Sequence, residues 1–90
     1  MPKFEWDPAK AAGNLRKHGV SFETAQKAFS DWNAIERLDD DPDEPRFIRI
    51  GMADGDVVAV VYTERRNVIR IISARKARRR EQKIYFDQTP

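Results

Sequence analysis

The sequence predicts an α+β fold in which helices pack against a central antiparallel sheet. Helical signals lie near the N-terminus and at the end of the chain, whereas strand-like runs joined by short turns fill residues 47–73. Consecutive hairpin strands pair antiparallel, and the helices outside such a run cover one face or one end of the sheet. The 90 residues allow one domain, residues 1–90, with no repeat or linker. The expected element order is β-α-α-β-β-β-β-α.

Residues 4–6 form a short predicted strand, and the helix after it should cover residues 8–18. Asp7 is a favourable N-cap, and Pro8 suits the first helical position because its missing N–H would be unpaired there. Gly19 supplies the C-terminal stop. Few apolar side chains are available to pack this helix on the sheet, and the expected ones are Ala12 and Leu15.

A second helix is predicted over residues 22–30, with Ser21 as its cap. Residues 34–38 should form a strand, whereas the acidic segment 39–45 contains two prolines and predicts a turn or loop. Helical spacing directs four apolar side chains of the second helix to the core: Phe22, Ala25, Ala28 and Phe29.

The second half of the chain predicts three consecutive strands and a terminal helix. The run 57–63 is apolar on both faces, so it should be central in the sheet. Asp54 and Gly55 accept the positive φ angles of a tight hairpin turn. The expected strands are 47–52, 57–63 and 68–73, with turns at 53–56 and 64–67 and a helix from about residue 76 to 86.

Composition excludes several classes of protein. The chain has no cysteine, which rules out disulfides, thiolate metal sites and a cysteine nucleophile. No apolar run approaches the roughly 20 residues of a membrane-spanning helix, and the N-terminus lacks the apolar core of a signal peptide. A cytoplasmic protein without membrane contact is therefore expected. The single histidine, the lack of a glycine-rich phosphate loop and the prolines of the acidic segment predict no metal site and no cofactor.

Charge is distributed unevenly along the chain. The net charge is only +2, but residues 1–44 carry 6 basic and 10 acidic side chains, and residues 45–90 carry 11 and 5. The segment 64–83 holds nine basic residues, seven of them arginines, whose planar guanidinium groups suit phosphate recognition. A solvated helix face explains Arg78, Arg79 and Arg80 equally well. That interpretation fits Arg70 and Arg75 less well, because Arg70 lies inside an apolar strand and Arg75 follows that strand directly.

Lys17 and His18 form a second candidate site. His18 is the only imidazole available for proton transfer near neutral pH. A Lys-His pair before a C-capping glycine also fits the helix dipole without any further function, so both interpretations stay open.

RNA can be cleaved without a metal because its own 2′-hydroxyl can be the nucleophile. The protein then supplies a base, an acid for the leaving 5′-oxygen, and cations for the developing phosphorane charge. The sequence offers groups for these roles: Lys17, His18, Tyr62, Glu64, Arg65, Arg75, Glu81 and Tyr85.

Several motifs in a fixed order resemble the BrnT family of bacterial type II toxins. They are FEWD at 4–7, Lys10, Asn14, KHGVSFE at 17–23, VVYTER at 60–65, RIISARKA at 70–77, Glu81 and Tyr85. The resemblance implies a RelE-like fold and a metal-independent endoribonuclease that blocks translation. It also implies a BrnA-like antitoxin, which neutralises the toxin, contacts operator DNA and represses the operon together with it.

The resemblance further implies roles for individual residues. Basic side chains on the sheet and terminal helix are expected to stabilise phosphate, and packing is the favoured role of Trp6. Glu64, Glu81 and Tyr85 are weaker candidates. The expected catalytic residues are Arg65, Arg75, Lys17 and His18, and the expected RNA-binding residues are Arg70, Lys76, Arg79 and Tyr62, the last of which could equally be a packing residue.

Two other functions are compatible with the arginine-rich segment. One is a nucleic-acid-binding module without catalysis, which differs from a ribonuclease in leaving RNA intact. The other is a protein-interaction domain whose basic groove receives an acidic partner, which predicts no affinity for RNA and binding that salt weakens.

Overall fold

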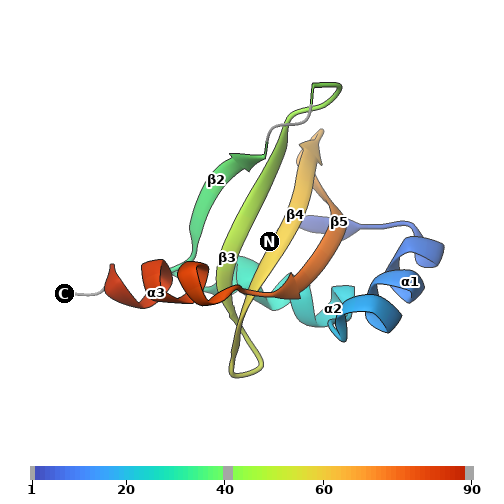
Figure 1. Cartoon of the computed structure of the whole chain (residues 1–90). Coiled ribbons are helices and arrows are strands. Elements are labelled where there is room, and N and C mark those ends of the chain that lie inside the picture. The colour runs from blue at the N-terminus through green and yellow to red at the C-terminus, as the bar shows by residue number, and fades with distance from the viewer. Residues whose placement is uncertain (1, 40–41, 89–90) are drawn as a thin grey trace.

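The computed structural model describes residues 2–39 and 42–88 and confirms the α+β fold (Figure 1). Five strands form one sheet in the order β1-β5-β4-β3-β2, so the apolar strand β4 is central as predicted. All neighbours pair antiparallel except β1 and β5, which are parallel. The elements are β1 (Lys3–Glu5), α1 (Pro8–His18), α2 (Phe22–Ala25), the 3₁₀ helix η1 (Gln26–Ser30), β2 (Ile35–Asp39), β3 (Arg46–Ala53), β4 (Asp56–Arg65), β5 (Val68–Lys76) and α3 (Arg79–Asp87).

The two faces of the sheet are covered differently. One, which we call the helix face, packs against α2 and η1, with α1 beside them near β5. The other face, which we call the open face, is covered by α3 only at one end. In Figure 1 the open face is turned toward the viewer, with α3 in front of it. Side chains alternate between the two faces along each strand, so each strand contributes to both. The exception is a bulge in β5, where Ile72 is an extra residue between the pairs Tyr62–Ile71 and Val61–Ser73, and this bulge places Arg70 and Arg75 on the same face although they are five residues apart.

The larger core lies on the helix face. Phe22, Ala25 and Ala28 are fully buried there, and Phe29 packs against them, which confirms the predicted inner side of residues 22–30. The smaller core lies under α3 and joins Tyr85 to residues of β3 and β4. Trp6 packs edge-on against Phe22, with ring centroids 5.8 Å apart, so its predicted packing role is confirmed.

Helix α1 begins and ends as predicted, but its buried side differs. The Asp7 carboxylate accepts a hydrogen bond from the Ala9 N–H at 2.8 Å, and Gly19 adopts a left-handed conformation with φ 72°. Leu15 is half exposed and Ala12 is exposed, so the expected apolar face is wrong. Ala11 and the polar Asn14 face the sheet in their place.

Asn14 is buried because its amide satisfies backbone groups at the edge of β5. Its side-chain oxygen accepts from the Ala74 N–H at 3.1 Å, and its nitrogen donates to the carbonyls of Ala74 and Val20 at 2.8 and 3.0 Å. β1 pairs only with residues 68–70 of β5. The Asn14 side chain therefore takes the place of a neighbouring strand farther along that edge.

The last strand is longer than predicted and the last helix starts later. β5 continues to Lys76, because Arg75 and Lys76 still pair with Ala59 and Val58 of β4, and Ala77 donates its N–H to the Val57 carbonyl at 2.9 Å. Strand β4 likewise extends to Arg65, which leaves Arg66 and Asn67 as a two-residue turn with φ angles of 52° and 67°. Arg75 is thereby a strand residue with a fixed direction.

No helix among the described residues is long and apolar enough to cross a membrane.

Candidate active site

Three arginines of the basic segment share the open face of the sheet. The register opposes Arg65 to Val68, Arg70 to Thr63 and Arg75 to Ala59. Ala59 belongs to the core under α3, which fixes the direction of its pairing partner Arg75. The open face therefore carries a row of guanidinium groups on β4 and β5.

Arg75 is held by a buried carboxylate at the end of this row. Its Nη1 and Nη2 donate to Glu81 Oε1 and Oε2 at 2.7 and 3.0 Å, an arrangement that fixes both the position and the plane of the guanidinium. The Arg37 Nη2 adds a bond of 3.3 Å to Oε2 from β2. The Arg78 backbone N–H donates to Oε1 at 2.8 Å and ties the carboxylate to the start of α3.

This arrangement leaves Arg75 able to bind an anion. A guanidinium has five N–H donors. Glu81 takes one from each terminal nitrogen of Arg75, and the Lys76 carbonyl accepts a longer bond of 3.4 Å from Nη1, which leaves two N–H groups for an anion. The Arg75 side chain is 21% exposed and the Glu81 side chain 8%, so the arginine meets solvent while the carboxylate lies behind it. The geometry suits a fixed cation facing a phosphate group.

Glu81 is a poor proton acceptor at neutral pH. The hydrogen bonds from Arg75 lower its pKa to about 2, against the opposing effect of burial. A carboxyl group that ionises so readily serves better as an anchor for Arg75 than as a general base. The geometry and the lowered pKa therefore favour a positioning role for Glu81 over the weaker catalytic role considered above.

We expect the stability of the protein to depend on pH through Glu81. Because its pKa in the folded chain is lower than in the unfolded chain, ionised Glu81 stabilises the fold above about pH 4.5, and this contribution falls away toward pH 2. Glu81→Gln should lower the free energy of unfolding at pH 7 by up to about 3 kcal/mol. In urea titrations at pH 7, 4 and 2.5, the difference in the free energy of unfolding between wild type and variant should become smaller as the pH falls. An equal difference at all three values would contradict this role.

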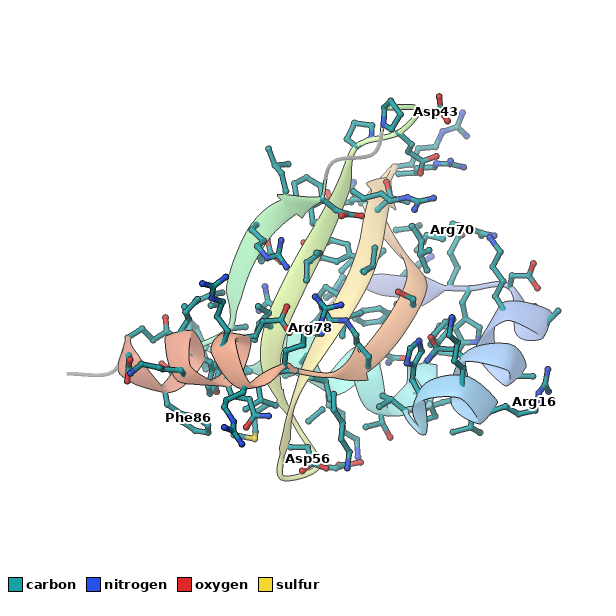
Figure 2. All side chains as sticks on the ribbon, viewed as in Figure 1. Arg16, Asp43, Asp56, Arg70, Arg78 and Phe86 are labelled. Atoms are coloured by element: carbon teal, nitrogen blue, oxygen red, sulfur yellow. The ribbon has the colours of Figure 1, made fainter. Side chains whose placement is uncertain are left out.

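Arg65 and Arg75 are not brought together. Arg65 lies six residues from Ala59 along β4, roughly 20 Å from the position opposite Arg75. It is exposed, and its Nη2 contacts the Glu44 carboxylate at 2.6 Å. Arg70, labelled in Figure 2, lies between the two and pairs with Glu5 at 2.8 Å. The three arginines are therefore too far apart to contact a single phosphate group.

Lys17 and His18 lie on α1, the helix that packs beside β5. They occupy the last turn of α1, one turn beyond Asn14, which contacts the residue preceding Arg75. Both side chains are exposed, and the basic last turn followed by a left-handed Gly19 is the capping arrangement that the sequence also allowed. Because α1 packs beside the strand that carries Arg75, a role of Lys17 and His18 in RNA contact or proton transfer stays a prediction.

Tyr62 lies on the helix face, away from the arginine row. Its side chain packs between Phe29 and Phe47, with ring centroids 4.9 and 5.5 Å away, and only 7% of the residue is exposed. Its hydroxyl donates to Glu36 Oε2 at 2.5 Å. Burial, with the Glu36 carboxylate beside it, raises the pKa of Tyr62 above its usual value. This position favours packing, the alternative that the sequence left open, over RNA contact.

Tyr62→Phe should therefore affect stability and leave RNA binding unchanged. The variant loses one hydrogen bond to a carboxylate that Arg49 also contacts at 2.8 Å, so we expect a loss of about 1 kcal/mol in urea denaturation. RNA affinity, measured by fluorescence anisotropy, should stay within twofold of wild type. A severalfold weaker affinity with unchanged stability would restore Tyr62 as an RNA contact.

The remaining candidates lie apart from one another on β4, β5 and α3. Lys76 is exposed and alternates with Arg75, so it leaves the strand on the other side. Arg79 is exposed in the first turn of α3, and Glu64 is exposed near the end of β4. Tyr85 is buried and donates its hydroxyl to Asp31 at 2.5 Å. Burial and that hydrogen bond raise the pKa of Tyr85 to about 12, which suits a structural role.

One member of the site escaped the sequence analysis. Arg37 lies outside the basic segment 64–83, yet it reaches Glu81 from β2. Because Arg37 lies in the middle of a five-residue strand, its side chain must point to one of the two sheet faces. Only the pairing of β2 with β3 shows that this is the open face.

No cluster of three or more metal-binding side chains occurs within residues 2–39 and 42–88. Asp40 and Asp41 of the acidic segment lie outside the described residues.

Residues 6–81 match a family model described as a ribonuclease toxin, BrnT, of a type II toxin–antitoxin system. No curated protein matches the chain at a significant level.

Proposed function

The chain belongs to the BrnT family of ribonuclease toxins of type II toxin–antitoxin systems, and from this we propose that it cleaves RNA internally on the open face of its sheet, at Arg75. The observation that carries the proposal is the guanidinium of Arg75, which Glu81 holds in place at two points while part of it faces solvent. A fixed cation of this kind stabilises charge that develops on a phosphate without reorganising during the reaction.

The proposed reaction is a transesterification within the RNA. The 2′-oxygen attacks the adjacent phosphorus while the bond to the 5′-oxygen breaks, and a base removes the 2′-proton while an acid protonates the leaving oxygen. The products are a 2′,3′-cyclic phosphate and a 5′-hydroxyl, and no metal takes part. Arg75 stabilises the phosphorane, Arg70 and Arg65 hold neighbouring phosphates, and His18 or Lys17 transfers protons.

Support for the division of roles comes from pKa values and burial. Tyr85 and Glu81 are unsuited to proton transfer near neutral pH, because the pKa of the first is raised to about 12 and that of the second is lowered to about 2. His18 is the only histidine in the chain. It is exposed in the last turn of the helix that packs beside β5.

The direct test is to express the chain alone and examine both growth and RNA. We expect growth arrest and RNA fragments with 2′,3′-cyclic phosphate ends, which a ligase specific for such ends detects. Cleavage should persist in excess EDTA. A reversible complex with intact RNA would instead indicate a nucleic-acid-binding module, and no affinity for RNA would indicate a protein-interaction domain.

The membership in a type II toxin family also supports the proposal of a partner protein. A type II system contains a protein antitoxin, and we propose a BrnA-like chain that neutralises this toxin in the cytoplasm. The antitoxin would contact operator DNA, and the toxin would reach the operator only through it and act as co-repressor.

A further inference from the structure

Strand β2 is a free edge of the sheet with apolar side chains exposed beside it. Among residues 2–39 and 42–88 it pairs with β3 alone, so half of its backbone N–H and C=O groups point away from the sheet. Trp32, in the loop before β2, is 98% exposed, and Leu38 on the strand is 68% exposed. An unpaired strand edge next to an exposed tryptophan is typical of a protein–protein interaction surface.

The two faces next to this edge differ in character. On the helix face a hollow is lined by Phe29, Ser30, Asp31, Trp32 and Arg49, and Leu38 points to the same side because it pairs with Phe47. On the open face a groove of about 450 Å³ runs between β2 and α3. Its apolar lining consists of Ile35, Ile50 and Ile84, and its polar lining of Arg37, Arg78, Arg80 and Glu81.

We propose that β2 is the docking site of the antitoxin, which adds an extended segment to this edge with apolar side chains alternating with Asp or Glu. The proposal rests on the function proposed above, which supplies the antitoxin. Because side chains of a strand alternate between faces, one set would cover Trp32 and Leu38, and the other would meet the arginines of the groove.

Charge favours an acidic segment over the other possible occupants. Three arginines line the groove against one glutamate, and that glutamate already binds Arg75 and Arg37. In the centred antiparallel register, a second copy of β2 would place Arg37 opposite Arg37, which is unfavourable. RNA would meet the arginines but would leave Leu38, on the opposite face, uncovered.

The position of the segment also explains neutralisation. Arg37 both lines the groove and contacts the carboxylate that holds Arg75. Carboxylates bound in the groove would lie beside Arg75 and repel an approaching phosphate. Docking on β2 would therefore block the open face without contacting Arg75 itself.

The test measures binding of the antitoxin encoded with this toxin, co-produced as a complex and analysed by competition with labelled wild-type toxin. Trp32→Ala combined with Leu38→Lys should weaken binding at least 100-fold, and Arg37→Glu at least 10-fold. Leu15→Ala is the matched control, because Leu15 is also half exposed but lies on α1 near the other edge, and it should bind within twofold of wild type. Hydrogen exchange of the amides of residues 35–39 should slow in the complex.

Three other results of these binding measurements would overturn the docking site on β2. Unchanged affinity in the β2 variants, with unchanged exchange at residues 35–39, would place the antitoxin elsewhere and overturn the docking site while keeping the partner. No complex with the wild type would remove the antitoxin from the proposed function, and the docking site with it. Variants that bind the antitoxin normally but lose RNA would make β2 an RNA surface and overturn the proposal.

Discussion

Arg75→Ala should reduce RNA cleavage by about 100-fold or more, which is the usual consequence of removing a fixed charge or donor from a developing phosphorane or oxyanion. The effect should be mainly on kcat, because the remaining arginines of the open face still attract RNA. Arg65→Ala should cost far less, since Arg65 is exposed, contacts Glu44 and lies roughly 20 Å away along β4. Its loss should appear as a weaker salt dependence of RNA binding.

Two further variants separate the catalytic role of Arg75 from a structural one. Arg75→Lys keeps the charge but loses the two-point contact with Glu81, so cleavage should fall nearly as far as with alanine. Glu81→Gln leaves Arg75 present but less well held, and should lower kcat by a smaller factor. Urea denaturation shows whether each variant is folded under the assay conditions. Folded Arg75→Ala protein with undiminished cleavage would exclude Arg75 from the reaction.

The elements that local signals define were predictable from the sequence. Asp7, Pro8 and Gly19 bound α1, and the alternation and turn residues of the later strands gave their order, because capping and hairpin turns depend on neighbouring residues. The parallel pairing of β1 with β5 was not predictable, since it joins residues more than sixty positions apart. Nothing local in the sequence indicates which strand a three-residue segment joins.

The site was predictable as a set of residue types and not as a geometry. The arginine-rich segment was identified, yet the expected helix start near residue 76 ended the last strand too early. The strand continues through Arg75 because its backbone still pairs with β4, and this places the guanidinium on the open face within reach of Glu81. The separation of Arg65 from Arg75 follows from the same register.

Replacing Asn14 should destabilise the fold more than any other single change on α1. The Asn14 amide satisfies three backbone groups, namely the N–H and C=O of Ala74 and the C=O of Val20. Asn14→Leu has a similar volume but removes all three bonds at a buried position. Each buried polar group that loses its partner costs about 1–3 kcal/mol, and some rehydration at the sheet edge is expected. A total loss of about 3 kcal/mol or more follows.

The measurement is urea denaturation, with Leu15→Ala as the control from the next position of the same helix. Leu15 is half exposed, so its truncation should change the free energy of unfolding by less than about 0.5 kcal/mol. Asn14→Asp should destabilise at least as much as Asn14→Leu at pH 7, because its carboxylate would face the carbonyl oxygens of Ala74 and Val20 at a buried position. Amide exchange at Ala74 should accelerate in Asn14→Leu beyond the effect of global stability, since this N–H faces the edge of β5. A small loss of stability with unchanged exchange at Ala74 would mean that α1 does not protect this edge, and that Lys17 and His18 are not held beside β5 by Asn14.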